Sequence, residues 1–387
     1  MIPYGRHNID EVDIAAVVDV LRSDWLTTGT KIHEFEQAMA RMVHAREAVA
    51  VSNGTAALHT AMHAIGLQPG DEVIVPPLTF VATANAVVMC GGVPVFADVD
   101  PQTLLLDPQA VEEKITTRTK AILAVDYAGQ PCDYQALRDI ADRYGLVLMA
   151  DACHALGASV EGQPVGSLAD LTIFSFHPVK AMTTGEGGMV VTMHSHYAER
   201  MRVFRNHVIT TNHQQRVKKQ TWKYQMVDLG MNYRLTDFQC ALGLSQLRKL
   251  PGWITRRQAI ASQYDEGLAS VPGIHPLLTR PGISHAFHLY VIRVKEDEFG
   301  VDRAALFTLL RKQGIGAQVH YIPVHLQRFY RERFGTKPGL CPNAETAYEG
   351  ILSLPIYPRL KNEEVINVID ATKNIAIGQA MITTAVS

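Results

Sequence analysis

Residues 48–192 alternate short apolar runs with longer segments of helical period, and this alternation constrains the fold more than any other feature of the sequence. Such runs are typical of β-α units wound into a mostly parallel sheet that is buried on both faces. The candidate strands are residues 48–52, 72–75, 93–98, 121–126, 146–151, 171–176 and 188–192. The candidate helices between them include residues 55–65, 110–115 and 134–144. The pattern predicts an α/β fold with helices on both faces of a central sheet.

The pattern changes after residue 193, and residues 200–230 are polar and irregular. Helical spacing returns over residues 236–249 and 252–269, with an interruption at Pro251 and Gly252. The elements expected beyond them are strands at residues 288–294 and 317–321, a helix at 303–313 and a last helix after residue 362. We therefore expect a large domain over residues 1–250 and a smaller α+β domain over residues 251–387.

Charge and cysteine content exclude several classes of protein. With 36 basic and 38 acidic residues, the net charge of −2 creates no global field that would hold the chain on a nucleic-acid backbone. The five cysteines are odd in number and form no C-x-x-C pair, so they indicate neither a disulfide framework nor a zinc site. We expect a protein of a reducing, cytoplasmic compartment that has no nucleic-acid partner and no metal.

One uncharged stretch is long enough to raise the question of a membrane span. Residues 73–97 carry no charge, but three prolines and two glycines break the run. Residues 1–13 carry early charges and lack the apolar region of a secretory signal. We therefore interpret residues 73–97 as a buried strand, helix and strand, and we expect no membrane association.

The first candidate site lies where a strand opens directly into a helix. Ser52, Asn53, Gly54 and Thr55 stand at this junction. The free N–H groups of a helix start, with a glycine that allows close approach and a hydroxyl beside it, form a phosphate-binding cradle. The same residues are also typical of an ordinary Asn or Thr helix cap, so both interpretations remain open here.

Asp151 stands at the carboxyl end of the candidate strand at residues 146–151. Ligands of open α/β sheets bind at this edge. A carboxylate there either holds a cation or pairs with a protonated ring nitrogen. His154 lies three residues later and makes a metal pair the rival interpretation, although two ligands without a third are a weak metal signal. A capping Asp beside a packed His is a further alternative.

Lys180 follows the candidate strand at residues 171–176 through a short turn and precedes a glycine-rich segment at residues 184–188. A lysine delivered in this way can approach a small molecule closely enough for Schiff-base chemistry, in which a neutral amine attacks an aldehyde. A lone lysine is far more often a solvated surface residue. The turn at residues 229–235 is a fourth candidate, which a purely structural turn explains equally well.

The first three features together are more specific than any one of them. A phosphate cradle, a strand-end Asp and a downstream Lys occur in the order that is typical of enzymes that use pyridoxal 5'-phosphate (PLP). In such an enzyme the helix start binds the phosphate and the Asp pairs with the pyridinium nitrogen. The Lys forms the Schiff base with the cofactor aldehyde.

Six segments carry a resemblance to a known family. They are residues 52–58 (SNGTAAL), 77–85 (PLTFVATAN), 151–157 (DACHALG), 174–180 (FSFHPVK), 184–188 (TGEGG) and 230–235 (GMNYRL). These segments resemble the nucleotide-sugar aminotransferases of the DegT/DnrJ/EryC1/StrS family, over a region from about residue 26 to residue 355. The resemblance implies a PLP fold-type I architecture, like that of aspartate aminotransferase. It also implies a homodimer whose active sites lie at the subunit interface.

The resemblance assigns roles to individual residues. The catalytic pair would be Lys180, which binds the cofactor covalently, and Asp151, which faces its pyridine nitrogen. The other expected cofactor-binding residues are Gly54, Thr55 and Ser175 at the phosphate, Phe80 and His154 on the two faces of the ring, and Asn232 at the phosphate of the partner subunit's cofactor. The expected substrate-binding residues are Tyr4, Trp25, Leu26, Thr27, Gln318, His320 and Tyr321.

Three further features are similar to one branch of the family, which acts in pseudaminic acid biosynthesis. They are residues 125–129 (VDYAG), His154 in place of the Gln of many relatives, and residues 318–323 (QVHYIP). This similarity implies transamination at C4 of UDP-2-acetamido-2,6-dideoxy-β-L-arabino-hexos-4-ulose, with L-glutamate as donor and pyridoxamine 5'-phosphate between the half-reactions. The product would be UDP-4-amino-4,6-dideoxy-N-acetyl-β-L-altrosamine. Lys180 separates the chain from members that have His there and act as dehydratases.

Alternatives remain open at this point. The same motifs occur in aminotransferases for other nucleotide-linked keto-sugars, at C4 of a D-sugar or at C3, and a regulatory protein could bind PLP without turnover. The basic stretch at residues 200–224 contains Arg202, Arg205, Arg216, Lys218, Lys219 and Lys223, interleaved with Trp222 and Tyr224. This stretch either contacts the UDP diphosphate or is a solvated loop, and nucleic-acid binding is the rival of a different class.

Overall fold

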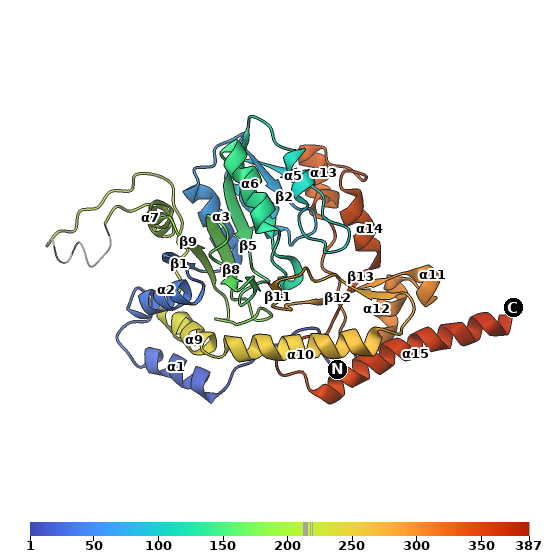
Figure 1. Ribbon diagram of the computed structural model, residues 1–387. Helices are drawn as coiled ribbons and strands as arrows, with labels where there is room; N and C mark the ends of the chain where they lie inside the picture. The colour runs from blue at the N-terminus through green and yellow to red at the C-terminus, as the bar shows by residue number, and fades with distance from the viewer. Residues whose placement is uncertain (212–215, 217, 219, 387) are drawn as a thin grey trace.

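The computed structural model describes residues 1–211, 216, 218 and 220–386 of the chain (Figure 1). Its central sheet consists of β1 (Glu47–Val51), β2 (Glu72–Val75), β3 (Val93–Phe96), β4 (Thr119–Val125), β5 (Val147–Asp151), β8 (Leu171–Ser175) and β9 (Gly188–Thr192). The strand order is β1-β9-β8-β5-β4-β2-β3. Neighbouring strands are parallel except β9, which is antiparallel to β1 and β8. The mostly parallel sheet predicted from the apolar runs is confirmed.

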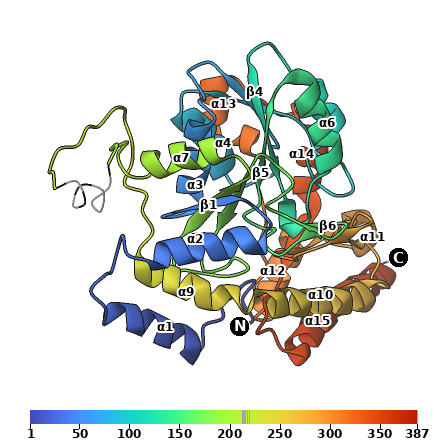
Figure 2. The same ribbon diagram turned by 60° about the vertical axis from the view of Figure 1, so that its left-hand side comes forward.

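Helices cover both faces of this sheet. Successive side chains of a strand point to opposite faces, so each face has its own hydrophobic core. On β1, Val49 and Val51 join the core under α3, α4, α6 and α7, whereas Ala48 and Ala50 join the core under α2 and α9. Figure 2 shows α2 and α9 side by side, and α1 packs against α9. The helices are α1 (Glu11–Leu21), α2 (Lys31–Met42), α3 (Gly54–Ala64), α4 (Ala82–Met89), α5 (Pro108–Glu112), α6 (Tyr134–Tyr144), α7 (Ser195–Phe204) and α9 (Asp237–Leu247).

A smaller antiparallel sheet follows in the C-terminal part, with β12 between β10 and β13. Its core packs against the long helix α10 and against α12 and α15. The elements are α10 (Leu250–Leu268), β10 (Ile274–Pro276), β12 (Tyr290–Val294), α11 (Glu296–Phe299), α12 (Arg303–Lys312), α13 (Arg328–Phe334), α14 (Pro342–Gly350), β13 (Ile351–Leu354) and α15 (Asn362–Val386). A third small sheet joins β11 (Ile283–Ser284), β6 (Ser159–Val160) and β7 (Gln163–Pro164). None of the described helices combines the length and the apolar character needed to cross a bilayer.

The first residues of the chain lie along this C-terminal part. The Ile2 N–H donates to the Gly314 carbonyl at 2.8 Å, and the Gly316 N–H donates back to the Ile2 carbonyl at 2.7 Å. The Ile356 N–H then donates to the Tyr4 carbonyl at 3.1 Å. The backbone of the N-terminus is therefore held by residues that are more than 300 positions away in the sequence.

Two expectations from the sequence are wrong in part. Residues 317–321 do not form a strand, because a single bridge between Gln318 and Ser353 joins them to β13 before His320 and Tyr321 leave the sheet edge. Residues 200–230 are not irregular throughout, because α7 extends to Phe204. The spacing of the buried Ala198, Met201 and Phe204 places them on one face of that helix.

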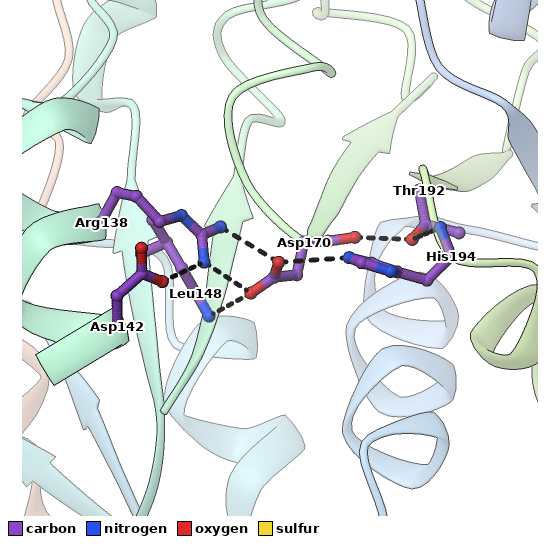
Figure 3. A network of polar contacts seen from close by, with 6 residues as sticks. All are labelled: Arg138, Asp142, Leu148, Asp170, Thr192 and His194. Atoms are coloured by element: carbon purple, nitrogen blue, oxygen red, sulfur yellow. Dashed lines mark hydrogen bonds and ion pairs between the residues drawn. The ribbon is translucent and has the colours of Figure 1, made fainter. Parts of the chain in front are cut away.

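A polar network around Asp170 ties β5, β8 and β9 together at one edge of the central sheet (Figure 3). The carboxylate of Asp170, which directly precedes β8, accepts a hydrogen bond from Arg138 Nη1 at 3.2 Å and forms an ion pair with Nη2 at 3.1 Å. It also accepts the Leu148 N–H at 2.9 Å. His194 Nε2 lies 3.3 Å from it, and the Thr192 hydroxyl donates to the Asp170 carbonyl at 2.6 Å. The opposite ends of the same three strands carry the candidate site.

Candidate active site

A cavity of about 430 Å³ opens at the carboxyl ends of β5 and β8, beside the first turn of α3. Ten of the residues predicted from the sequence line it: Tyr4, Gly54, Thr55, Phe80, Asp151, His154, Ser175, Lys180, His320 and Tyr321. Its volume lies within the range of about 300–1,000 Å³ that is usual for small-molecule sites. The position agrees with the edge of an α/β sheet at which ligands bind.

The start of α3 has the features of both a helix cap and an anion cradle. Asn53 is the cap, and its side-chain oxygen accepts the Ala56 N–H at 2.8 Å. The N–H groups of Gly54 and Thr55 have no partner within the helix, and both residues line the cavity. A Cβ on Gly188 would lie 2.3 Å from the Asn53 carbonyl oxygen, so only glycine allows β9 to pass this turn. The two interpretations of this segment are therefore compatible.

Ser175 completes the cradle from the end of β8. A Cβ added to Gly54 would lie 3.0 Å from the Ser175 Cβ and 3.1 Å from its hydroxyl oxygen. The serine hydroxyl and the open N–H groups of α3 therefore lie at one end of the cavity. Backbone N–H groups, a helix start and a hydroxyl form a donor set suited to a phosphate group.

Asp151 ends β5, and both of its carboxylate oxygens have protein donors. The Thr83 hydroxyl donates to Oδ2 at 2.7 Å, and the Cys153 N–H donates to Oδ1 at 3.3 Å. The Thr83 hydroxyl lies in turn 2.8 Å from the Thr79 hydroxyl. Within the described ranges, no group of three or more His, Cys, Asp or Glu side chains is arranged to hold a metal ion.

Lys180 lies half-buried at the wall of the same cavity and forms no ion pair with any described residue. Its backbone N–H donates to the His177 carbonyl at 2.9 Å, which closes the turn after β8. Burial lowers the pKa of the Lys180 amine, although the nearby Cys153 and Asp151 act in the opposite direction. A lowered pKa increases the fraction of neutral amine, which is the form that attacks a carbonyl carbon.

Two side chains from different elements offer flat faces to the cavity. Phe80 follows β2 and is 57% exposed, whereas His154 follows β5 and is buried. His154 Nε2 lies 3.2 Å from the Tyr321 hydroxyl, and the His154 ring lies 4.3 Å, between centroids, from the ring of His288. Burial holds the pKa of His154 well below its usual range, with the Lys180 charge acting in the same direction. His154 is therefore a neutral ring, suited to stacking.

Several residues that line the cavity were not predicted as site residues from the sequence. Thr79, Thr83 and Cys153 lie within motifs quoted for the resemblance, and the four-residue spacing of the two threonines could have indicated a shared face. Glu186 lies inside the glycine-rich segment. His288 had no signal in the sequence, because it reaches the cavity only through tertiary packing.

Five predicted residues lie outside this cavity. The Leu26 carbonyl accepts the Asp237 N–H, and the Gln318 N–H donates to the Ser353 carbonyl. Asn232 forms an isolated β-bridge with Asn206. Trp25 and Thr27 line a separate cavity of about 910 Å³, together with Arg202, Arg205, Arg216 and Arg234. The structure does not bring these five residues together with Lys180 in a single subunit.

The basic stretch at residues 200–224 divides into two parts. Arg202 and Arg205 form ion pairs with Glu47 and Glu36, so they have structural partners. Trp222 and Tyr224, in the second part, are exposed. Lys219 lies outside the described residues.

Comparisons with known proteins cover nearly the whole chain. The model of the DegT/DnrJ/EryC1/StrS aminotransferase family matches residues 7–373. The spore coat polysaccharide biosynthesis protein SpsC of Bacillus subtilis is 40% identical over 379 residues, which are 97% of each chain.

Two solved structures are similar over their full length. One is a protein of Streptococcus pneumoniae assigned as a sugar aminotransferase, in its PMP form, with 32% identity and a TM-score of 0.92 over 98% of this chain and 100% of that chain. The other is PseC of Helicobacter pylori, an aminotransferase involved in the biosynthesis of pseudaminic acid. It has 33% identity and a TM-score of 0.91 over 97% of this chain and 99% of that chain.

Proposed function

Because this chain belongs to the DegT/DnrJ/EryC1/StrS aminotransferase family, we propose that it aminates C4 of UDP-2-acetamido-2,6-dideoxy-β-L-arabino-hexos-4-ulose. The product is UDP-4-amino-4,6-dideoxy-N-acetyl-β-L-altrosamine, a precursor for pseudaminic acid, and the amino donor is L-glutamate. The chain is a PLP-dependent sugar aminotransferase of fold type I.

The residues that line the cavity suit this cofactor in their donor chemistry. The α3 start and Ser175 suit its phosphate, Asp151 suits its ring nitrogen, and the amine of Lys180 has no ion-pair partner among the described residues. When bound, PLP supplies an electron sink that stabilises negative charge on the carbon from which a proton is removed.

The protein's own groups supply binding and proton transfer. Asp151 would place a negative charge opposite the ring nitrogen, and Phe80 and His154 would hold the ring between them. Lys180 Nζ removes the proton from Cα of L-glutamate in the first half-reaction. In the second half-reaction it delivers a proton to C4 of the sugar. Both transfers need the amine to change its protonation state near neutral pH, which the lowered pKa of Lys180 favours.

One observation carries the choice of sugar. The three features that resemble the pseudaminic branch meet at one wall of the cavity. The Tyr127 hydroxyl, from residues 125–129, donates to the His320 carbonyl. The Tyr321 hydroxyl lies 3.2 Å from His154 Nε2. Because these segments lie together at one wall, they support the same substrate as that of the pseudaminic branch. The similarity to PseC also supports it.

A second candidate has its own support. The chain is 40% identical to SpsC, a spore coat polysaccharide biosynthesis protein, and 33% identical to PseC. The alternative substrate is therefore another nucleotide-linked keto-sugar, aminated at C4 of a D-sugar or at C3. The wall built by Tyr127, His154 and Tyr321 would then serve a different hexose.

We also propose that two copies of the chain complete each active site. Trp25, Thr27 and Asn232 lie outside the cavity of their own subunit, although the family resemblance gives them substrate or cofactor contacts. Trp25 and its neighbour Leu26 are exposed apolar side chains, and Trp222 is exposed as well. A homodimer would cover these side chains and supply Asn232 to the partner's site. All five cysteines are free thiols, which supports a cytoplasmic location.

The absorbance spectrum of the purified protein tests the proposed reaction. We expect L-glutamate to remove the visible absorbance of the bound cofactor, and the UDP-4-keto-sugar to restore it. If glutamate acts and this sugar does not, the second candidate is correct and other keto-sugars identify the substrate. If bound PLP does not respond to glutamate, the chain is a PLP-binding regulatory protein and the proposed reaction is wrong.

A further inference from the structure

Thr79, Thr83 and Asp151 form a continuous buried chain of hydrogen bonds beside the cavity. The two threonine hydroxyls are 2.8 Å apart, and the Thr83 hydroxyl is 2.7 Å from Asp151 Oδ2. Their exposed fractions are 3%, 0% and 6%. Thr83 lies in the first turn of α4, and Thr79 lies four residues before it, just ahead of the helix. The chain is therefore a fixed part of the fold.

The direction of these hydrogen bonds follows from the chemistry of the groups. An ionised carboxylate only accepts, so the single proton of the Thr83 hydroxyl must point to Asp151. The Thr83 oxygen can then only accept from Thr79. The Thr79 hydroxyl thus donates to Thr83, and the Thr83 hydroxyl donates to Asp151 Oδ2. Each of these two hydrogen bonds polarises and strengthens the other.

This chain of donors also joins the carboxylate to the aromatic wall. Phe80 lies directly after Thr79, and its carbonyl accepts the Thr83 N–H at 3.2 Å. The same turn of backbone therefore carries Phe80 and places the Thr83 hydroxyl. The remaining oxygen of Asp151 has a weaker partner, the Cys153 N–H at 3.3 Å.

We propose that Thr83, supported by Thr79, is a positioning residue that fixes the orientation of the Asp151 carboxylate and aims it at the ring nitrogen. This inference rests on the role proposed above for Asp151. Without the Thr83 donor, the buried Asp151 carboxylate would keep a single hydrogen bond from the described residues, the 3.3 Å contact with the Cys153 N–H. Loss of a hydrogen bond to a charged group corresponds to about 10- to 100-fold in an equilibrium or rate constant.

Four single variants separate this role from packing. Thr83→Val removes the hydroxyl and keeps the shape, whereas Thr83→Ser keeps the hydroxyl. Thr79→Val removes only the second donor. Thr172→Val is the matched control, because Thr172 is 1% exposed and its hydroxyl has no hydrogen-bond partner in the described part of the chain. Thermal melting of all four checks that they fold.

Two readouts are measured for each variant: the affinity of the PLP-free protein for added PLP by titration calorimetry, and kcat and KM for the sugar. For Thr83→Val we expect both the affinity and kcat to fall about 10- to 100-fold, with KM changed less than about threefold. We expect Thr83→Ser and Thr172→Val to stay within about threefold of the parent, and Thr79→Val to lie between the two groups.

A double-mutant cycle with Asp151→Asn shows whether Thr83 acts through Asp151. We expect Thr83→Val to change PLP affinity less than about threefold in the Asp151→Asn background. Full additivity, or an equally large loss in Thr83→Ser, would overturn the proposal. If the parent does not respond to glutamate, the proposed reaction fails, but the PLP affinities still test the role of Thr83.

Discussion

At the scale of single residues, two neighbouring strand ends each carry a buried carboxyl group. Asp126 follows β4 directly, and its N–H donates to the Asp151 carbonyl at the end of β5. Asp126 Oδ1 accepts from the Cys132 N–H and the Tyr134 hydroxyl, whereas Oδ2 has no partner among the described residues. Burial, followed by repulsion from Asp151, raises the pKa of Asp126 to about 7. Asp126 is thus kept neutral over much of the acidic range.

The raised pKa of Asp126 makes stability depend on pH in a definite direction. Between pH 4 and 7 the native state keeps a proton on Asp126 that the unfolded chain has lost, so its stabilising contribution falls as the pH rises. Asp126→Asn should remove this loss, so that the variant gains up to about 4 kcal/mol relative to the parent between pH 4 and 7.

Urea unfolding of Asp126→Asn and the parent at several pH values checks this expectation. The difference in unfolding free energy should grow over that window and stay constant above it. A difference that does not vary with pH would mean that Asp126 is charged in the native state.

Lys180→Ala tests the central residue of the proposed reaction. We expect no detectable turnover, because no other amine lines the cavity in the described part of the chain. The melting temperature should change little, because the side chain lies at the wall of a cavity and not in a core. Product formation is followed by chromatography, and Lys295→Ala, which removes an exposed lysine, is the control. Normal turnover in Lys180→Ala would contradict the assignment.

At the scale of elements, the Asp170 network fixes the strands at the edge opposite the cavity. Asp170→Ala would leave the Leu148 N–H and the Arg138 guanidinium without their partner. We expect a loss of about 2–3 kcal/mol in unfolding free energy, with kcat nearly unchanged. Asp142→Ala is the matched control, since Asp142 contacts the same arginine at 3.4 Å but is 67% exposed. Chemical denaturation of both variants makes the comparison, and equal losses would show that the network adds nothing.

The sequence was sufficient for the elements whose burial is uniform. Most residues of the central strands are apolar because the sheet is covered on both faces, so an apolar run alone predicts these strands. The segment at residues 317–321 also looks like such a run, but two of its side chains, His320 and Tyr321, line the cavity and its backbone forms a bridge at Gln318. The local pattern of apolar residues does not distinguish a buried strand from a segment that lines a cavity.

The residues of the candidate site that follow buried strands in a set order along the chain could be predicted from the sequence. Asp151 and Lys180 stand at strand ends, and the family resemblance placed Phe80, His154 and Tyr321. The partners that orient them were not predictable. The contact of Thr83 with Asp151 spans 68 positions, and the contact of His288 with His154 spans an even longer separation. Such contacts depend on the packing of whole elements against one another.

At the scale of the whole molecule, the proposed dimer can be tested by mixing two inactive variants. Asn232→Ala and Lys180→Ala should each be inactive alone, because each lacks one residue in every site. A mixed dimer would contain one site with both residues, since Asn232 of the Lys180→Ala subunit completes the site of its partner.

Random mixing should restore roughly a quarter of the parent activity. The two variants are unfolded together, refolded and assayed, with each refolded alone as the control. If the mixture recovers no activity, Asn232 acts within its own subunit.

The backbone contacts of Ile2 and Tyr4 with residues 314–316 and 356 have a consequence for biosynthesis. Tyr4 forms part of the cavity wall, and residues near the other end of the chain hold it there. A ribosome delivers the first residues early, but this wall stays unfinished until almost the whole polypeptide has emerged. A nascent chain that has not yet reached residue 356 therefore lacks a contact that holds Tyr4 in the wall of the cofactor pocket.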